Sequence, residues 1–395
     1  MITPLAWVTW WCATASLCVF ALRRAALTAA SLRRRSLPEL GEETLPRFWV
    51  LVAVRNEARN VNRLCSTLRQ LDYPAMKVLI ADDASEDDTA RLLRAVTDPA
   101  WTVLPSSGGP RGKAAVLRAA ATTAGLQDDD LLLVLDADHT MSPTSLHDLL
   151  PWFDDLRTQA VAFAHRVRTP DRSLTTIYCT LEGAVSEEVT GRGKAALGLG
   201  VSLSGSWAAR ARAFLDHYPD GEEFADDATF AARLYAAGWK VEFADNVVST
   251  HDVPTSVGVY LRQHIRWSKG LYDVGRRQAA GLVGAVGQSV RSRIDWLMTA
   301  AGYAERPIAL AWLLSSLILW LTGTNIVALI VPPALSASVV LAQIVLALAR
   351  IGASARMWLL TPVAVVTLAA VDVVAATGGA LDGVARRVGW RPARS

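Results

Sequence analysis

Short apolar runs alternate with segments of helical periodicity through the middle of the chain. Residues 48–54 form a nearly continuous apolar run, which is typical of a strand buried on both faces. Further strands are predicted at 77–81, 101–104 and 131–135, and helices at 61–71, 90–96 and 113–124. Because strands and helices alternate, the pattern predicts an α/β domain with a mostly parallel sheet.

Both ends of the chain are apolar over lengths that fit a lipid bilayer. Residues 5–22 carry no charge, and five arginines follow them before residue 36. A cleavable signal peptide has its positive charge before the apolar run. We therefore expect an uncleaved anchor over 1–24 with its N-terminus outside, followed by a basic linker over 25–47 on the cytoplasmic side.

The C-terminal region, residues 305–381, predicts two to three membrane spans. Stretches 308–331 and 357–376 are long enough to cross a bilayer. The stretch 335–349 is short for a span, and the prolines at 332–333 are expected to break the helix before it.

The number of C-terminal crossings stays open, because the positive charges around them conflict. Three crossings would place the basic tail, 382–395, outside the cell, which the positive-inside rule disfavours. An even number would keep the tail inside but would misplace Arg350 and Arg356.

Residues 276–304, ahead of these spans, predict an amphipathic helix. Its apolar positions are Leu282, Val283, Val286, Val290, Ile294 and Leu297. Arg291 and Arg293 fall on other faces. Such a helix suits a membrane interface and equally suits packing against a soluble domain, and the pattern does not separate the two.

Composition excludes some classes of function. A net charge of +3, without a basic stripe interleaved with aromatic residues, argues against binding to nucleic acid. The four cysteines have neither metal-ligand nor disulfide spacing, which indicates a reducing compartment.

Acidic residues follow three of the predicted strands. Asp136 and Asp138 come directly after the run 131–135, and residues two apart on an extended chain point to the same side. Both carboxylates can therefore converge on one Mg²⁺ or Mn²⁺ ion that also binds phosphate. A solvated, Asp-rich turn is the alternative. Glu57 and Asp83 also end strands, which places three acidic sites along one sheet edge, where α/β proteins bind ligands.

These residues, in this order, resemble the membrane-bound, inverting family 2 glycosyltransferases with the GT-A fold. The resemblance extends from about residue 48 to 274 and indicates a cytoplasmic catalytic domain over 48–275. The matching motifs are residues 53–57, 82–89, 112–113, 136–138, 226–227 and 263–267. The group includes cellulose, chitin, hyaluronan and poly-N-acetylglucosamine synthases and ceramide glucosyltransferase.

The resemblance implies a nucleotide site at the first two strands. Asp83, with Asp82 beside it, would accept the N–H of the uracil of a UDP-sugar in a charge-assisted hydrogen bond. Arg55 and Glu57 would lie where the family's loops surround the nucleotide. The chain has Ala53 where the family usually has proline, a change of backbone that leaves the site residues in place.

The resemblance also implies a site for the diphosphate. Lys113, at the start of a helix, would reach a phosphate or the sugar, although an ordinary exposed lysine is the alternative. Asp138, assisted by Asp136, would hold Mg²⁺ or Mn²⁺ against the diphosphate. His251 is either an additional ligand or a structural histidine.

Asp227 matches the family's general base, with Asp226 in support where the family usually has glutamate. Neighbouring carboxylates raise each other's pKa, which helps a base to work near neutral pH. A helix N-cap is the alternative role for Asp227. Residues 204–207 match a family loop near the acceptor.

The motif Gln263-x-x-Arg266-Trp267 places its residues on one face of a helix. Arg266 suits a bidentate grip on the diphosphate, and Trp267 offers an apolar plate for the acceptor. An interfacial Arg-Trp pair near a membrane is the alternative.

The resemblance implies one in-line displacement that inverts a UDP-α-sugar and gives a β-linkage. A polysaccharide synthase of a bacterial inner (plasma) membrane is the preferred interpretation. Transfer of a single sugar to a ceramide-, sterol- or carotenoid-like lipid is the first alternative, and a non-catalytic sugar-nucleotide-binding subunit is the second. The expected partners are the UDP-sugar, a polysaccharide or lipid acceptor and the bilayer.

Overall fold

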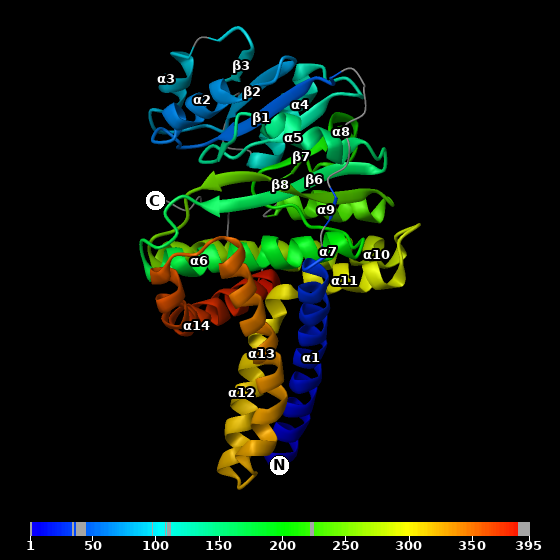
Figure 1. Ribbon diagram of the computed structural model, residues 1–395, viewed down its shortest axis with the longest axis vertical. Helices are drawn as coiled ribbons and strands as arrows, with labels where there is room; N and C mark the ends of the chain where they lie inside the picture. The colour runs from blue at the N-terminus through cyan, green and yellow to red at the C-terminus, as the bar shows by residue number, and fades with distance from the viewer. Residues whose placement is uncertain are drawn as a thin grey trace.

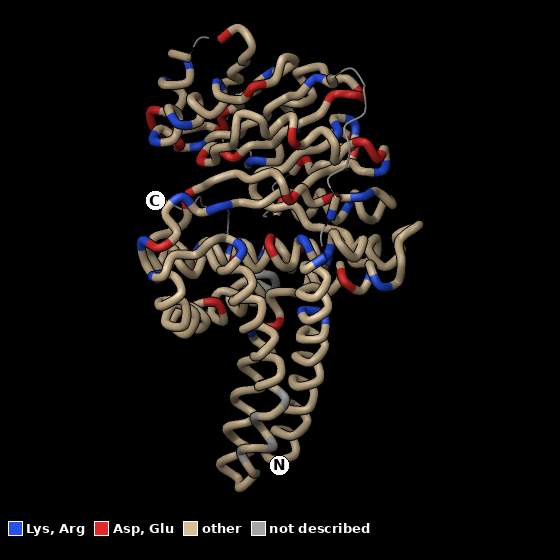
Figure 2. The backbone as a smooth tube through the Cα atoms, in the orientation of Figure 1, with Lys and Arg blue, Asp and Glu red and all other residues tan. Residues whose placement is uncertain are grey.

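The computed structural model has an α/β domain, a layer of long helices beneath it and a bundle of apolar helices below that (Figure 1). It describes residues 2–33, 35–36, 45–96, 98–106, 108, 112–221 and 225–385. Most charged residues lie in the upper part, and the lower bundle is almost free of them (Figure 2).

The first half of the sheet has the predicted parallel arrangement. The strands are β1 (Phe48–Val54), β2 (Met76–Asp82), β3 (Trp101–Leu104) and β4 (Leu131–Val134), joined by α2 (Val61–Gln70), α3 (Thr89–Arg94) and α4 (Lys113–Ala124). Each predicted strand and helix of this half is confirmed within about three residues at either end. All four strands end at the same sheet edge, as the alternating pattern requires.

The second half makes the sheet mixed. It contains β5 (Thr140–Met141), β6 (Thr158–Val167), β7 (Trp207–Arg210) and β8 (Lys240–His251), and the eight strands have the order β3-β2-β1-β4-β7-β6-β8-β5. β7 is antiparallel to both β4 and β6. β7 begins at Trp207, which pairs with Val134 at the end of β4. The chain therefore enters β7 at the sheet edge where β4 ends, and β7 runs in the direction opposite to β4.

Helices cover both faces of the sheet. Alternate residues of β1, such as Leu51 and Val52, belong to separate cores on the two sides. The remaining short helices are α5 (Ser145–Leu149), η1 (Leu150–Phe153), α8 (Ala211–His217) and α9 (Asp226–Ala236). Fully buried Trp207 packs against Phe214 and Phe230, which fixes α8 and α9 beside the end of β4.

Two long helical segments lie between the sheet and the apolar bundle (Figure 1). One is continuous through α6 (Leu174–Ala184), the π-helical turn η2 (Val185–Gly191) and α7 (Arg192–Ala196), and the other is α10 (Val257–Gly284). α7 crosses α1 (Ile2–Ser31) so closely that a Cβ atom on Gly193 would lie 2.2 Å from the carbonyl oxygen of Leu27. The glycine at 193 is therefore explained by helix packing.

Replacing Gly193 with alanine is expected to destabilise the protein by about 1–3 kcal/mol, because the backbone of α1 would have to move. Gly183 is the matched control, since a Cβ atom there meets nothing within 4 Å and alanine is the better helix former. In detergent, Gly193→Ala should lower the apparent melting temperature and Gly183→Ala should leave it equal or higher. Equal melting temperatures for both variants would contradict the close contact.

Among the residues that the structure describes, four helices are long and apolar enough to cross a membrane: α1, α12 (Glu305–Leu321), α13 (Ile326–Arg350) and α14 (Ala355–Ala385). They support membrane association. α1 continues to Ser31, into the segment predicted as a basic linker. Arg23 and Arg24 lie within α1, and both side chains form ion pairs: Arg23 with Asp295 at 2.7 Å and Arg24 with Glu305 at 2.5 Å.

The expected helix break at residues 332–333 is wrong. α13 continues through both prolines, and the break lies instead at the turn after α12. There Gly323 has φ +93°, and the Asn325 side chain accepts a hydrogen bond from the Val327 amide at 2.9 Å, which starts α13. At its other end α14 extends to Ala385, and residues 386–395 of the predicted basic tail lie outside the described residues.

The single amphipathic helix expected over 276–304 is also wrong, because the chain turns at Gly287, where φ is +75°. α10 ends before the turn at Gly284, and α11 (Val290–Ala300) and the short η3 (Gly302–Ala304) follow it. Leu282 is fully buried, whereas Val286 and Val290 are exposed. Some of the apolar side chains in this segment are therefore buried against the α/β domain, and others are exposed at the surface.

α14 is fixed to α10 and α6 through one buried carboxylate. Asp372 accepts hydrogen bonds from the hydroxyls of Tyr178 (2.8 Å) and Tyr260, and from the Arg306 guanidinium at 3.2 Å. The ring of His264 stacks on Tyr260, with centroids 3.9 Å apart. A charge inside an apolar helix is thereby fully paired.

Candidate active site

The carboxyl ends of β1 and β2 form a cradle that the sequence predicted as a nucleotide site. Arg55 lies 3.8 Å from the Asp83 carboxylate, which also accepts the Gly112 amide at 3.1 Å. Asp82 is used differently, because its carboxylate accepts the amide and hydroxyl of Ser85 in its own loop, at 3.2 and 2.5 Å. Of the two aspartates, Asp83 is the one joined to residues outside its own loop.

The loops of this cradle have a strained backbone. Asn56 and Ala84 adopt φ values of +56° and +58°, which residues with side chains seldom do. The two loops hold each other, since Asn56 accepts the Glu86 amide at 2.8 Å and donates its own amide to Ser85 at 3.0 Å. Strain of this kind persists where the surroundings impose it, and it concentrates at binding sites.

Lys113 begins α4 and donates to Asp136 at 2.6 Å. Burial alone would raise the pKa of Asp136, but the Lys113 ammonium, together with the nearby rings of His139 and His165, holds the pKa well below its usual range. The Asp136 carboxylate, followed by that of Asp226, keeps the pKa of Lys113 high despite burial. Both groups are therefore charged at neutral pH, and Lys113 lies between the Asp136–Asp138 motif and the acidic pair.

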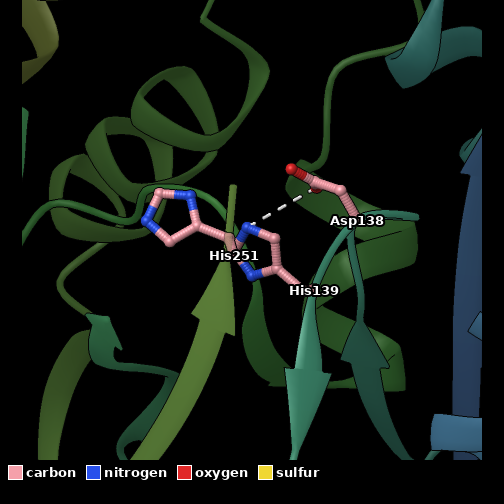
Figure 3. Close-up of side chains that lie close together, drawn as sticks. All are labelled: Asp138, His139 and His251. Atoms are coloured by element: carbon pink, nitrogen blue, oxygen red, sulfur yellow. Dashed lines mark ion pairs between the residues drawn. The ribbon is translucent and has the colours of Figure 1, made fainter. Parts of the chain in front are cut away.

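Asp138, His139 and His251 bring their ligand atoms within 4.8 Å of one another (Figure 3). The Nε2 atom of His139 lies 3.9 Å from a carboxylate oxygen of both Asp138 and Asp136. Burial, then the charges of Asp136 and Glu57, raise the pKa of Asp138 to about 7. A divalent cation would relieve this repulsion, and a mixed carboxylate and imidazole set suits Mn²⁺ better than Mg²⁺, so the residues fit a metal site.

Residues behind the cluster orient His139. Its Nδ1 atom lies 2.9 Å from the Ser206 hydroxyl and 3.0 Å from the Ser249 hydroxyl, which leaves Nε2 for the carboxylates. Burial lowers the pKa of His139 well below its ordinary value, so the ring is neutral, as a metal ligand must be. His165 completes this layer through hydrogen bonds with Glu187 at 2.8 Å and with the Ser206 carbonyl at 3.1 Å.

Sequence reasoning missed His139 and His165 and left His251 undecided. His139 had a local signal, because it directly follows Asp138. His165 lies in β6, and His251 ends the neighbouring parallel strand β8. Their contact with the β4 edge depends on the order of the strands.

The acidic pair lies at the first turn of α9. The Tyr218 hydroxyl donates to Asp226 at 2.5 Å, and one oxygen of Asp227 accepts the Ala228 amide at 2.7 Å. Burial, followed by the Asp226 charge, raises the pKa of Asp227 to about 7. Asp227 thus contacts the first turn of the helix and also has the pKa of a base that works at neutral pH.

α10 brings Arg266 to these carboxylates. Burial lowers the pKa of Arg266, and the charges of Asp226, Asp227 and Asp136 oppose that shift. Trp267 is 41 % exposed, with its ring 4.8 Å from that of His264. The Gln263 side chain is half-buried and makes no hydrogen bond within the described part of the chain. The structure therefore places Arg266 near enough to the acidic pair to feel its charge and leaves Trp267 at the surface.

Known proteins with similar sequences match more than half of this chain. Poly-beta-1,6-N-acetyl-D-glucosamine synthase of Staphylococcus aureus is 23 % identical over 244 residues, which are 60 % of this chain and 57 % of that protein. Beta-monoglucosyldiacylglycerol synthase of Synechocystis sp. is 25 % identical over 290 residues, 68 % of this chain and 57 % of that protein. The matches thus span less than two thirds of these relatives.

The fold is also that of a solved enzyme. The mannosyltransferase PcManGT from Pyrobaculum calidifontis, solved with GDP-Man and Mn²⁺, superposes with a TM-score of 0.65 at 18 % identity, covering 98 % of this chain and 100 % of that one. This similarity confirms the predicted GT-A fold. Residues 46–270, more than half of the chain, match the family described as glycosyltransferase like family 2. The chain therefore belongs to family 2 of the glycosyltransferases.

Proposed function

We propose that the protein transfers a sugar from a UDP-α-sugar to an acceptor hydroxyl, with inversion to a β-linkage. The observation that carries the proposal is the pKa of Asp227, about 7, in a site that also holds Lys113, Asp136 and Arg266. A base that is partly ionised at neutral pH lies beside cations suited to a leaving diphosphate.

Each group has one role in the proposed displacement. Asp227 accepts the proton of the acceptor hydroxyl, whose oxygen bonds to the anomeric carbon as the bond to UDP breaks. Asp226, held by Tyr218, keeps the pKa of Asp227 raised. Arg266 and Lys113 stabilise the negative charge that develops on the diphosphate.

A divalent cation is proposed as the cofactor. Asp138, His139 and His251 would hold it, with Asp136 nearby but already paired to Lys113. When bound, Mn²⁺ or Mg²⁺ supplies positive charge to the diphosphate. Arg55, Glu57 and Asp83 are proposed to hold the nucleotide, with Asp82 shaping the loop.

A membrane lipid bearing a hydroxyl is the acceptor that the structure favours. α1 packs against both α12 and α13, and this small group of helices offers little to enclose a passage for a growing polymer. The glycolipid synthase match agrees with this choice. Polysaccharide synthesis is the second candidate, favoured by the match to the staphylococcal synthase.

A donor screen tests this proposal. Purified protein in lipid nanodiscs would be given a panel of UDP- and GDP-sugars, and nucleotide release would be measured with and without Mn²⁺. Chromatography of the radiolabelled product would then separate a glycolipid from a polymer. Release of nucleotide without glycosylated product, for every donor, would favour a non-catalytic subunit.

The catalytic domain is proposed to face the cytoplasm, with α1, α12 and α13 crossing the membrane. α14 packs along α10 and α6, and Figure 1 shows it close beneath α6 while the other three helices extend away. If α14 stays at the inner surface, Arg350 and Arg356 lie on the same side as the catalytic domain.

Cysteine labelling tests these crossings in a variant whose four native cysteines are replaced by serine. Thr324→Cys, between α12 and α13, should react with a membrane-impermeant maleimide in intact cells. Ser395→Cys, after α14, should react only after permeabilisation. Labelling of Ser395→Cys in intact cells would show that α14 crosses.

A further inference from the structure

A basic cavity lies where α1 and α13 meet the back of the catalytic domain. Its volume is about 290 Å³, and it is lined by Ser31, Leu32, Arg33, Arg35, Arg192, Asp245 and Arg350. Four of the seven lining residues are arginines and one is acidic. A polar cavity of this size holds more than a single water molecule.

Two of the four arginines already have carboxylate partners. Arg192 pairs with Glu188 at 2.8 Å and Asp245 at 2.7 Å, and Arg35 pairs with Glu242 at 2.7 Å. These contacts fix the guanidinium groups in place. They also occupy Asp245, the acidic residue among the described residues that line the cavity.

The other two arginines bring positive charge without a carboxylate. Among the described residues, Arg350 donates hydrogen bonds to two backbone carbonyls, those of Glu188 and of Ser31, the latter at 2.6 Å, and to no carboxylate. The exposed Arg33 side chain makes no hydrogen bond or ion pair to any residue that the structure describes. The cavity therefore has an excess of positive charge and unused guanidinium N–H donors, the groups that bind phosphate in a fork.

The cavity lies at the level expected for lipid headgroups. The candidate span in α1 extends to Ser31, past Arg23 and Arg24, and that in α13 ends at Arg350, and both Ser31 and Arg350 line the cavity. This placement requires only that α1 and α13 cross the membrane. Basic pockets between spans on the cytoplasmic side are suited to anionic lipid headgroups.

The cavity is separate from the active site. Asp245 lines the cavity, and His251 of the metal cluster lies six residues further along β8. At roughly 3.3 Å per residue, the two lie about 20 Å apart along the strand. The donor site and this cavity therefore do not share residues.

We propose that this cavity binds a phosphate group, supplied by the headgroup of an anionic phospholipid. Arg33 and Arg350 would grip the phosphate oxygens, with Arg35 and Arg192 completing the positive surface. The Ser31 hydroxyl is already used, since it donates to the Thr28 carbonyl at 2.8 Å. A bound headgroup would tie the inner ends of α1 and α13 to the catalytic domain.

The experiment measures thermal stability and retained lipid in purified full-length protein. The melting temperature would be followed in detergent on titration with phosphatidylglycerol, phosphatidylcholine or inorganic phosphate, and native mass spectrometry would count bound lipid. Phosphatidylglycerol should raise the melting temperature and phosphatidylcholine should not. Stabilisation by millimolar inorganic phosphate, displacing the lipid, would identify the free anion as the source of the phosphate.

Arg33→Gln is the decisive variant, because the Arg33 side chain is exposed and has no hydrogen bond or ion pair with a described residue to lose. It should weaken phosphatidylglycerol binding about tenfold or more, since a charged hydrogen bond contributes that much. Nucleotide release in detergent should stay at the wild-type rate. Arg350→Gln should lose more binding, although it also loses its carbonyl contacts.

Arg356→Gln is the matched control, an exposed arginine near the same span end that does not line the cavity. It should bind phosphatidylglycerol as the wild type does. Equal losses in Arg33→Gln and Arg356→Gln, or no response of the wild type to either anion, would overturn the proposal.

Discussion

Replacing Asp227 with asparagine is expected to lower kcat by roughly 10²–10⁴-fold, the usual contribution of a general base. The amide has nearly the shape of the carboxylate and its oxygen can still accept the Ala228 amide, so the start of α9 should be preserved. UDP affinity, measured by calorimetry, should change little. Nucleotide release in the presence of acceptor is the measurement of turnover.

The wild-type pH profile gives the same prediction a second test. Because the base must be ionised and its pKa is about 7, kcat/KM should rise as the pH increases through about 7 and then level off. The residual kcat/KM of Asp227→Asn should not show this rise with pH. Asp220→Asn, an exposed aspartate nearby, should behave as the wild type. Near-normal turnover of Asp227→Asn would remove this residue from the mechanism.

Removing divalent cations is expected to abolish transfer, with the larger recovery on adding Mn²⁺. The cluster combines one carboxylate with two imidazoles, and without a cation the diphosphate would face Asp136, Asp138 and Glu57 directly. Asp138→Ala and His251→Ala should each weaken the metal activation constant by about 10–100-fold or more. Titration of dialysed protein with Mn²⁺, followed by nucleotide release, measures this constant.

His147→Ala is a control for the loss of a histidine, since His147 packs on Tyr73 in another part of the domain. Its Mn²⁺ activation should match the wild type. Full activity in excess chelator would show that Lys113 and Arg266 alone stabilise the leaving group. An unchanged activation constant in His251→Ala would restrict that residue to a structural role.

The first half of the fold could be predicted because its signals are local. Continuous apolar runs such as Leu131–Leu133 mark strands buried on both faces, and Gly112 marks the start of α4. The acidic residues at the β1, β2 and β4 ends followed from the rule that parallel strands end together. Periodicity and one topological rule were therefore sufficient for the Asp83, Lys113 and Asp136 region.

The second half depends on contacts between distant segments. The antiparallel entry of β7 depends on how residues 198–206 return to the β4 edge, and no local pattern encodes that path. His165 and His251 reach the cluster only because β6 and β8 pair in parallel. Likewise, the apolar sequence of α14 predicts a membrane span, which stays a prediction, and gives no sign that Asp372 attaches this helix to α10 and α6.

The attachment of α14 through Asp372 also constrains the order in which the protein can be completed during synthesis. Chains fold largely from the N-terminus as they emerge from the ribosome. α10, with Arg266, emerges well before α14, so Tyr178 and Tyr260 lack the Asp372 carboxylate until the end of the chain is made, although Tyr260 also donates to Glu182 at 3.0 Å. The helix that carries Arg266 is therefore among the last parts of the α/β domain to reach its final packing, although most of that domain is translated first.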